Sequence, residues 1–424
     1  MSVAGRLAAF VAGTIRLTDA VTQMAKQIVT NAMALALASW KEEPASTAFA
    51  IVEGFRTPPQ ATVWGRNARV GVAWAALLNG TAVHFEDFDD THMRTLLHPG
   101  PVIVPAAVAS MEYCHASSAA VLEGVVLGTE VAMRIGNGIS PAHYERGWHV
   151  TSTMGRLGAA VAAARILSLS AEQTRDALAI AALESGGVTA ALGTMTKPLH
   201  PGKAAFDGIE AALVARQGVA GATNAIESEF GLAALTSDRL DEAAIFDGLG
   251  ERWEILTNSF KPYSCGLVSH PIIDAAIELR GEFPAAEIAR VEVTAHPLVL
   301  DLMGKTDPRD GLESKFSAYH CAAIGFIYGA GGPQQFSDEC ARDEAVRTLR
   351  GKTTIVTSED VPKGSAHVRV FDRSGKSKES KIVHATGSIE APMSALQLDR
   401  KWRGLLGDRF TELDALLAGY GIAP

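Results

Sequence analysis

The chain has 424 residues, of which 47% are hydrophobic and 20% charged, and its formal net charge is −9. A single hydrophobic core stops growing near ~250–300 residues, so two or more domains are expected. The negative charge argues against nucleic acid or an anionic membrane surface as a partner, because either would select clustered Lys and Arg. No stretch approaches ~18 uninterrupted apolar residues, so no membrane span is predicted.

The four cysteines, Cys114, Cys265, Cys321 and Cys340, have no CxxC or metal-ligand spacing. In a chain of this size, that usage favours reduced thiols in a cytoplasm-like compartment. Residues 1–15 are mildly apolar, but they lack a basic start, a long apolar run and an A-x-A cleavage site. No signal peptide is therefore predicted, and we expect a cytoplasmic protein.

Up to about residue 255 the sequence has the periodicity of helices rich in Ala and Gly. The apolar runs 72–83 and 102–111 predict buried helices, and a further run, 121–135, ends at the stop signal Gly136-Asn-Gly138. Ser170-Ala-Glu-Gln173 predicts a capping box that opens the next helix. Helices that are apolar over most of their circumference belong in the centre of a many-helix domain.

After Trp253 the pattern changes to two-residue alternation. Residues 288–296, 366–371 and 381–384 alternate between apolar and polar, which is typical of half-buried strands. Helical runs lie between them, and the tail, 395–419, returns to helical periodicity. This mixture predicts an α+β segment followed by terminal helices.

The predicted fold is therefore mainly α, with two domains. A large all-helical domain comprises residues 1–255 plus 391–424, and a smaller α+β lid domain comprises residues 256–390. Strands are expected only in the smaller domain, and the terminal helices are expected to pack back on the larger one.

Five polar islands interrupt the apolar pattern. They span residues 87–98, 143–149, 193–202, 261–270 and 307–317. Each joins a base or cation to Gly or Pro, but each alone also fits a solvated loop or a helix cap. Acids and imidazoles beside apolar elements need partners or a ligand, and perturbed groups of this kind collect at functional sites.

Together the islands suit the removal of a proton beside a carboxylate. This reaction needs a base, and it needs cations that hold the charge developing on the carboxylate. The candidate cations are His98, His149, Lys197, His270 and Arg309. Asp87 can orient an imidazole, and Tyr144 is a candidate acid or base on the opposite face of the substrate.

Several other kinds of site are disfavoured. The chain has no GxGxxG after a strand and no GxxxxGK[ST], so no nucleotide phosphate site is predicted. HExxH and Gly-x-Ser-x-Gly are also absent. The run Asp87, Asp89, Asp90 suggests magnesium, but the two-by-two repetition of a DDxxD box is missing. No metal and no organic cofactor are therefore predicted.

In this order, the islands resemble the 2-methylcitrate dehydratase family, also called MmgE/PrpD. It includes 2-methylcitrate dehydratase, cis-aconitate decarboxylase and iminodisuccinate epimerase. The similarity runs from about Asn79 to Ala330 and rests on NGxxxHxxDxDDT, HPG, GWHxT, GTMTKPLHxGKAA, CxxxxH and GLExKFS. It implies an all-helical domain with an inserted α+β lid, small di- or tricarboxylate substrates, no cofactor and a homodimer.

The resemblance also implies site residues. The catalytic candidates it implies are His149, Lys197, His98, Asp87 and Tyr144, and the substrate-binding candidates it implies are Thr91, His200, His270 and Arg309. Arg94 and Lys261 are added to the substrate-binding candidates as cations within the islands, and dehydratases need not share Arg94. The contexts of Arg309 and Tyr144 look more like the epimerase branch than the decarboxylase. Tyr319 and His320 lie near the place of the decarboxylase's aromatic hydroxyl but out of register, so their roles stay open.

We therefore predict a cofactor-independent enzyme that abstracts a proton α to a carboxylate. Dehydration is favoured, and epimerisation or decarboxylation is the alternative. A non-catalytic carboxylate-binding protein is the rival from another class, but His98, His149 and Lys197 argue against it, because binding alone needs no base. The pocket residues, Asp87, Thr91, His98, His149, Lys197 and His270, are expected to face one cavity between the domains.

Overall fold

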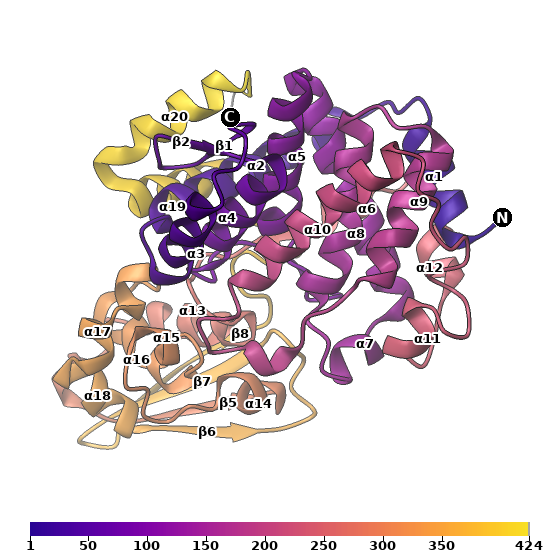
Figure 1. Cartoon of the computed structure of the whole chain (residues 1–424). Coiled ribbons are helices and arrows are strands. Elements are labelled where there is room, and N and C mark those ends of the chain that lie inside the picture. The colour runs from indigo at the N-terminus through magenta and orange to yellow at the C-terminus, as the bar shows by residue number, and fades with distance from the viewer. Residues whose placement is uncertain (423–424) are drawn as a thin grey trace. The chain divides into compact units, whose positions relative to one another are not determined.

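The computed structural model describes residues 1–422 and divides the chain into two compact units (Figure 1). Unit 1 contains residues 1–85, 89–258 and the described residues from 402 onward, and unit 2 contains residues 86–88 and 259–401. Helices make up 57% of the chain and strands 11%, which confirms the mainly α fold. No helix among the described residues is long and apolar enough to cross a membrane.

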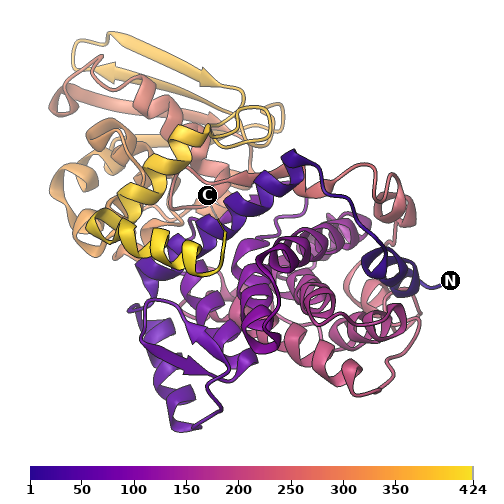
Figure 2. The ribbon, with the colours of Figure 1, turned by 90° about the horizontal axis from the view of Figure 1, so that it is seen from above.

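Unit 1 is built from helices. They are α1 (Val3–Ala12), α2 (Asp19–Ser39), α3 (Glu43–Gly54), α4 (Val72–His84), α5 (Gly100–Cys114), α6 (Ser118–Ile139), α7 (Ala142–Glu145), α8 (Val150–Ile166), α9 (Ala171–Leu183), α10 (Leu199–Arg216), α11 (Leu232–Thr236), α12 (Glu242–Phe246) and α20 (Phe410–Gly419). The predicted capping box is present at Ser170 and Gln173. Figure 2 shows the C-terminal helix α20 beside α2, with which it is in contact.

Helix α8 lies at the centre of unit 1 and packs against α5, α6, α9 and α10 (Figure 1). Small residues permit these contacts. A Cβ atom on Gly158 of α8 would lie 2.7 Å from the carbonyl oxygen of Gly128 in α6. The two backbones therefore approach more closely than any larger residue at these positions allows.

Two glycines should respond to Ala in opposite directions. Gly158→Ala is expected to lower the free energy of unfolding by about 1–3 kcal/mol, because the clash outweighs the gain in helix propensity. Gly404 lies in α19 (Ala395–Leu406) with nothing within 4 Å of an added Cβ. Gly404→Ala should therefore stabilise by up to about 1 kcal/mol. Denaturant unfolding measures both, and equal effects of the two substitutions would contradict the close-packing argument.

Two expectations for unit 1 are wrong in detail. Helix α6 continues through the predicted stop at Gly136-Asn-Gly138 to Ile139. A Cβ on Gly138 would lie 2.7 Å from Ile245, so this glycine provides space for α12 rather than ending the helix. Strands are also not confined to residues 256–390.

Three short strands lie in the first 250 residues. They are β1 (Ala61–Val63), β2 (Ala68–Val70) and β3 (Asp90–His92). β1 and β2 form an antiparallel hairpin with Ala61 opposite Val70. A strand of three residues is too short to show two-residue alternation, which explains why the sequence did not predict these elements.

Unit 2 contains a four-stranded sheet with helices beside it. Its strands are β5 (Ile288–Ala295), β6 (Thr353–Thr357), β7 (Ala366–Asp372) and β8 (Ser377–Ile382), in the order β6-β5-β7-β8. β5 pairs parallel with β6 and antiparallel with β7, and β7 pairs antiparallel with β8. β4 (Asn258–Phe260) contains the boundary between the units. The helices are α13 (His270–Glu278), α14 (Leu298–Met303), α15 (Gly311–Ser314), α16 (Ala318–Tyr328), α17 (Asp338–Arg342) and α18 (Glu344–Gly351).

The apolar residues of this sheet form the core of unit 2. Val291 and Val293 of β5 and Val368 and Val370 of β7 are buried in one cluster with residues of α13 and α16. The predicted strands at 288–296 and 366–371 are confirmed. β8 begins four residues before the predicted 381, because its first residues are polar and exposed and show no alternation.

His320, whose role the sequence left open, makes contacts within unit 2. Its Nε2 lies 2.7 Å from the carbonyl oxygen of Gln335, to which it donates, and its Nδ1 lies 3.5 Å from Nη1 of Arg350. Burial lowers the pKa of His320 to about 4. A proton on Nδ1 would face the guanidinium group, so the folded state keeps this ring neutral.

The pH dependence of stability should reflect this ring. The pKa of His320 is about 4 in the folded state and ~6.5 in the unfolded state. Between these values only the unfolded state binds the proton, so the contribution of His320 to the free energy of unfolding is complete above pH ~6.5 and is lost as the pH falls towards 4. The loss is at most roughly 3–4 kcal/mol, because the two pKa values differ by ~2.5 and each pKa unit corresponds to ~1.4 kcal/mol. Unfolding of His320→Gln between pH 7 and pH 4.5 should therefore depend less on pH than that of the unchanged protein. His384→Gln, on an exposed ring, is the control, and equal slopes for all three proteins would contradict this role.

Candidate active site

The segment between α4 and α5 carries the first group of predicted site residues in unit 1. His84 is the last residue of α4, Thr91 lies in β3, and His98 stands shortly before α5. The backbone N–H of His92 donates to the carbonyl oxygen of Leu97 over 2.8 Å, which closes a turn. The chain therefore doubles back and places His98 against Thr91, with 2.9 Å between Nδ1 and Oγ1.

Asp89 lies between two imidazoles. One carboxylate oxygen is 2.5 Å from Nδ1 of His84, and the other is 3.3 Å from Nδ1 of His98. Nδ1 of His98 also lies 3.1 Å from the carbonyl oxygen of Asp90. A carboxylate and a carbonyl only accept hydrogen bonds, so we assign the proton of neutral His98 to Nδ1. Its Nε2 then carries the lone pair.

Four imidazoles follow one another in this part of unit 1. The ring centroids of His98 and His84 are 5.1 Å apart, those of His84 and His149 are 6.0 Å apart, and those of His149 and His200 are 5.2 Å apart. His149 and His200 meet through their Nδ1 atoms at 3.0 Å, so one of them donates to the other. The structure therefore joins the islands around residues 87–98, 143–149 and 193–202.

Lys197 acts electrostatically on three of these rings. Burial lowers the pKa of His84 to about 4, with Asp89 opposing the change and the charge of Lys197 adding to it. Burial also holds the pKa of His149 well below its usual range, and the charges of His84 and Lys197 lower it further. The buried Lys197 therefore lies within electrostatic reach of His84 and His149, whose lowered pKa values keep both rings neutral near pH 7.

The adjacent residues Asp89 and Asp90 have pKa values that are shifted in opposite directions. Burial raises the pKa of Asp89, but the neighbouring His98 and His84 outweigh it and hold the pKa well below its usual range. Burial, with the charge of Asp89, raises the pKa of Asp90 to about 7. An Asp90 oxygen accepts from Nδ2 of Asn258 over 2.8 Å and from the N–H of Gly100 over 3.3 Å. Asp89 is thus the anion of the pair.

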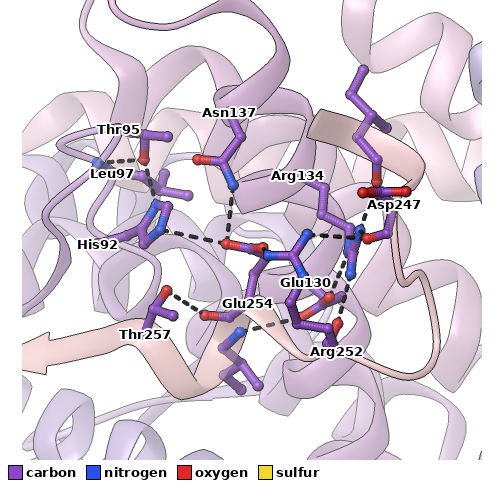
Figure 3. Close-up of polar contacts among 12 residues, drawn as sticks. His92, Thr95, Leu97, Glu130, Arg134, Asn137, Asp247, Arg252, Glu254 and Thr257 are labelled. Carbon is purple, nitrogen blue, oxygen red and sulfur yellow. Dashed lines mark hydrogen bonds and ion pairs between the residues drawn. The ribbon is translucent and has the colours of Figure 1, made fainter. Parts of the chain in front are cut away.

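A buried network of polar contacts holds the turn between His92 and Leu97 in place (Figure 3). His92 is 2.8 Å from Oγ1 of Thr95 through Nδ1, and its Nε2 faces the carboxylate of Glu254 at 3.9 Å. Nδ2 of Asn137, in α6, donates to the same carboxylate over 3.0 Å. The turn that carries Thr91 and His98 is thereby connected to the interior of α6.

Arg134 extends this network (Figure 3). Its Nε donates to Glu130 over 2.6 Å. Its two terminal nitrogens donate to the carbonyl oxygens of Ile245, Asp247, Gly248 and Arg252. All five N–H groups of the guanidinium are therefore used, and they hold the segment after α12 against α6.

A second buried ion pair stands beside His200. Arg156 of α8 is 2.5 Å from the carboxylate of Asp207 in α10, and it also donates to the carbonyl oxygen of Glu184, at the end of α9. Burial lowers the pKa of His200, and the charge of Arg156 lowers it further. This pair therefore holds both ends of the segment that contains Lys197.

Unit 2 contains further predicted site residues. Nζ of Lys261 lies 3.0 Å from a carboxylate oxygen of Asp87, and both residues are buried. Nζ of Lys315 lies 2.8 Å from the neighbouring Glu86. His270 is buried, with its Nε2 3.3 Å from the carbonyl oxygen of Cys265. That these residues share a cavity with those of unit 1 stays a prediction.

Three candidates lie outside these clusters as described. Arg94 is exposed, and Tyr144 is half-buried in α7. The side chain of Arg309 is 82% exposed, and its Nη2 is 2.7 Å from Glu313. Arg309 is thus occupied by an internal carboxylate, and its proposed role as a carboxylate ligand remains untested.

His84 and Asp89 are site residues to which the sequence analysis assigned no role. Both lie in NGxxxHxxDxDDT, and Asp89 also lies in the island 87–98, so these signals contained them without singling them out. With His98 they offer ligand atoms within 4.8 Å of one another, so these three residues have a donor set that could hold a metal ion.

Comparisons with known proteins agree with these features. A model of the MmgE/PrpD N-terminal domain matches residues 5–242, and a model of the MmgE/PrpD C-terminal domain matches residues 263–417. A cis-aconitate decarboxylase-like protein of Aspergillus oryzae is 27% identical over 91% of this chain and 86% of its own length. The mouse cis-aconitate decarboxylase is 29% identical, over 82% and 73%, and the human one 32% identical, over 62% and 56%.

Proposed function

Because the chain belongs to the MmgE/PrpD family, we propose that it is a lyase that removes a proton α to a carboxylate of a small di- or tricarboxylate. The observation that carries this proposal is that Nδ1 of His98 faces two acceptors, the carbonyl oxygen of Asp90 at 3.1 Å and the carboxylate of Asp89 at 3.3 Å. An ionised carboxylate at Nδ1 keeps Nε2 free to take a proton, and it stabilises the imidazolium that results. Neither a metal nor an organic cofactor takes part in this step.

His98 is the preferred base of this proposal rather than His149. Burial and neighbouring cations hold the pKa of His149 well below its usual range, which weakens it as a base. A neutral His149 can instead relay a proton, giving one up from one ring nitrogen while the other takes one up, through its contact with His200. This division of roles explains why the site has both an imidazole beside a carboxylate and an imidazole whose pKa is lowered by burial and by Lys197.

The cations of the site have a separate role. Proton removal moves negative charge onto the substrate carboxylate, and a buried ammonium stabilises that charge more strongly than water does. Lys197 supplies it in unit 1, with Thr91 as a hydrogen-bond donor. We propose Lys261 and His270 of unit 2 as further substrate ligands, with Asp87 orienting Lys261. A homodimer, as the family implies, completes the proposal.

Decarboxylation is the second candidate reaction, because the similar proteins from mouse and human are cis-aconitate decarboxylases. In that reaction the bond to a carboxylate breaks, and the carbanion left behind takes a proton from an acid. Protonated His98, stabilised by Asp89, could supply that proton. The same residues therefore serve elimination of water, decarboxylation and epimerisation, and the substrate decides between them.

The purified protein should be incubated with cis-aconitate, 2-methylcitrate, citrate and iminodisuccinate in D2O and followed by 1H NMR. Loss of water identifies a dehydratase, and release of CO2 identifies a decarboxylase. Deuterium exchange with inversion but no other product identifies an epimerase. Tight binding without turnover or exchange would overturn the proposal in favour of a carboxylate-binding protein.

A further inference from the structure

The site in unit 1 contains an arrangement that proton transfer alone does not require. His84, Asp89 and His98 are buried, and their ligand atoms lie within 4.8 Å of one another. Two imidazole nitrogens and a carboxylate suit Zn2+ and its neighbours in the transition series, whereas Mg2+ and Ca2+ prefer oxygen ligands. We propose that these three side chains form an inhibitory binding site for a divalent transition metal, with Zn2+ as the ion that fits best.

The spacing of the three side chains shows how far they must move to bind an ion. Oδ2 of Asp89 is 2.5 Å from Nδ1 of His84, and Oδ1 of Asp89 is 3.3 Å from Nδ1 of His98. Ligand bonds of about 2.0–2.2 Å in a tetrahedron place ligand atoms roughly 3–3.5 Å apart. The two contacts involve different oxygens of Asp89, so one oxygen must bind the ion. The three ligand atoms already lie within 4.8 Å of one another, and each needs to move by no more than about 1–2 Å to surround it. The ion then replaces the hydrogen-bonding protons, and each imidazole carries its proton on Nε2 instead.

Inhibition follows from the identity of the ligands. Three protein ligands leave a fourth position for water, as in zinc sites that are open to small molecules. The bound ion takes Asp89 and Nδ1 of His98 away from each other, so the pair that holds the base in its working form no longer exists. The inhibition, unlike the binding, rests on the proposed function.

Binding can be measured without any substrate. The full chain, freed of metals with EDTA, is titrated with ZnCl2 in a calorimeter and with CoCl2 by visible absorption, where tetrahedral Co2+ gives intense d–d bands. One equivalent of each ion should bind, and MgCl2 should give no heat. Asp89→Asn and His84→Gln should each weaken Zn2+ binding by at least about 100-fold. Loss of a residue that only hydrogen-bonds to a metal ligand weakens binding by about 10–100-fold, and loss of the ligand itself costs more. His384→Gln, at an exposed imidazole of unit 2, should leave it unchanged.

The proposal is overturned if no stoichiometric binding occurs, or if Asp89→Asn and His84→Gln bind Zn2+ as tightly as the unchanged protein. Circular dichroism checks that each variant is folded. If Asp89→Asn or His84→Gln does not fold, His98→Gln replaces it as the variant that lacks one ligand. In an assay with a substrate that is turned over, one equivalent of Zn2+ should abolish activity and EDTA should restore it. Full activity with Zn2+ bound would reject the inhibitory role. Failure of the proposed function would appear separately, as an absence of turnover in the metal-free protein.

Discussion

Replacing Asp89 by Asn should lower kcat by about 10³–10⁴-fold, with a much smaller change in KM. The amide offers a weaker acceptor to Nδ1 of His98, and its NH2 group can instead favour the opposite tautomer, which removes the lone pair from Nε2. An interaction that matters mainly in the transition state lowers kcat and kcat/KM together. Steady-state kinetics on the substrate found in the NMR experiment measures the effect.

Asp90→Asn is the matched control for this prediction. The pKa of Asp90 is raised to about 7 by burial and by the charge of Asp89, so its side chain is partly protonated near neutral pH. An amide preserves an acceptor for the N–H of Gly100, and we expect a loss of less than about tenfold. Equal losses in the two variants would mean that Asp89 has no special relation to His98.

Removing the charge of Lys197 should have the second large effect. Lys197→Met keeps most of the side-chain volume, and we expect turnover to fall by about 10²–10⁴-fold, because the substrate loses a buried cation. The pKa of His149 should rise at the same time, since the charge of Lys197 helps to lower it. It should stay below its usual range, because burial is the larger cause. Titration of 15N-labelled histidines by NMR follows this change without a substrate.

Lys203→Met provides the control, because Lys203 lies in the same motif but its side chain is 56% exposed and paired with Asp207. Its turnover should change by less than about threefold, as is usual for exposed ion pairs. If Lys197→Met kept full turnover while the pKa of His149 rose, Lys197 would be an electrostatic neighbour of the imidazoles and not a substrate ligand.

Elements with a strong local signal were predictable. The capping box at Ser170, the helix now described as α4 and the strand β5 each have a periodicity or an end signal within their own residues. Local patterns suffice there because hydrogen bonds within a helix, and the alternation of side chains along a strand, follow from neighbouring residues. Three-residue strands and the continuation of α6 past Gly136 had no such signal.

The sequence by itself indicated most of the candidate site residues, although it assigned no role to His84 and Asp89. The islands that contain His98, His149 and Lys197 were recognisable because titratable groups in apolar surroundings are concentrated at functional sites. It did not determine which groups form pairs. Asp89 and Asp90 are adjacent and identical in type, and nothing local distinguishes them.

The tertiary structure separates these two carboxyl groups. Asp89 is an anion because two imidazoles, one from the end of α4 and one from the start of α5, converge on its oxygens. The side chain of Asn258 and the N–H of Gly100 contact Asp90 instead, and burial together with the charge of Asp89 raises its pKa. Charge state depends on which groups surround a buried carboxyl in space, and packing brings those groups together from separate elements. For the same reason only the tertiary structure could show that Asp89 lies between His84 and His98, and hence which nitrogen of His98 is free to act as the base.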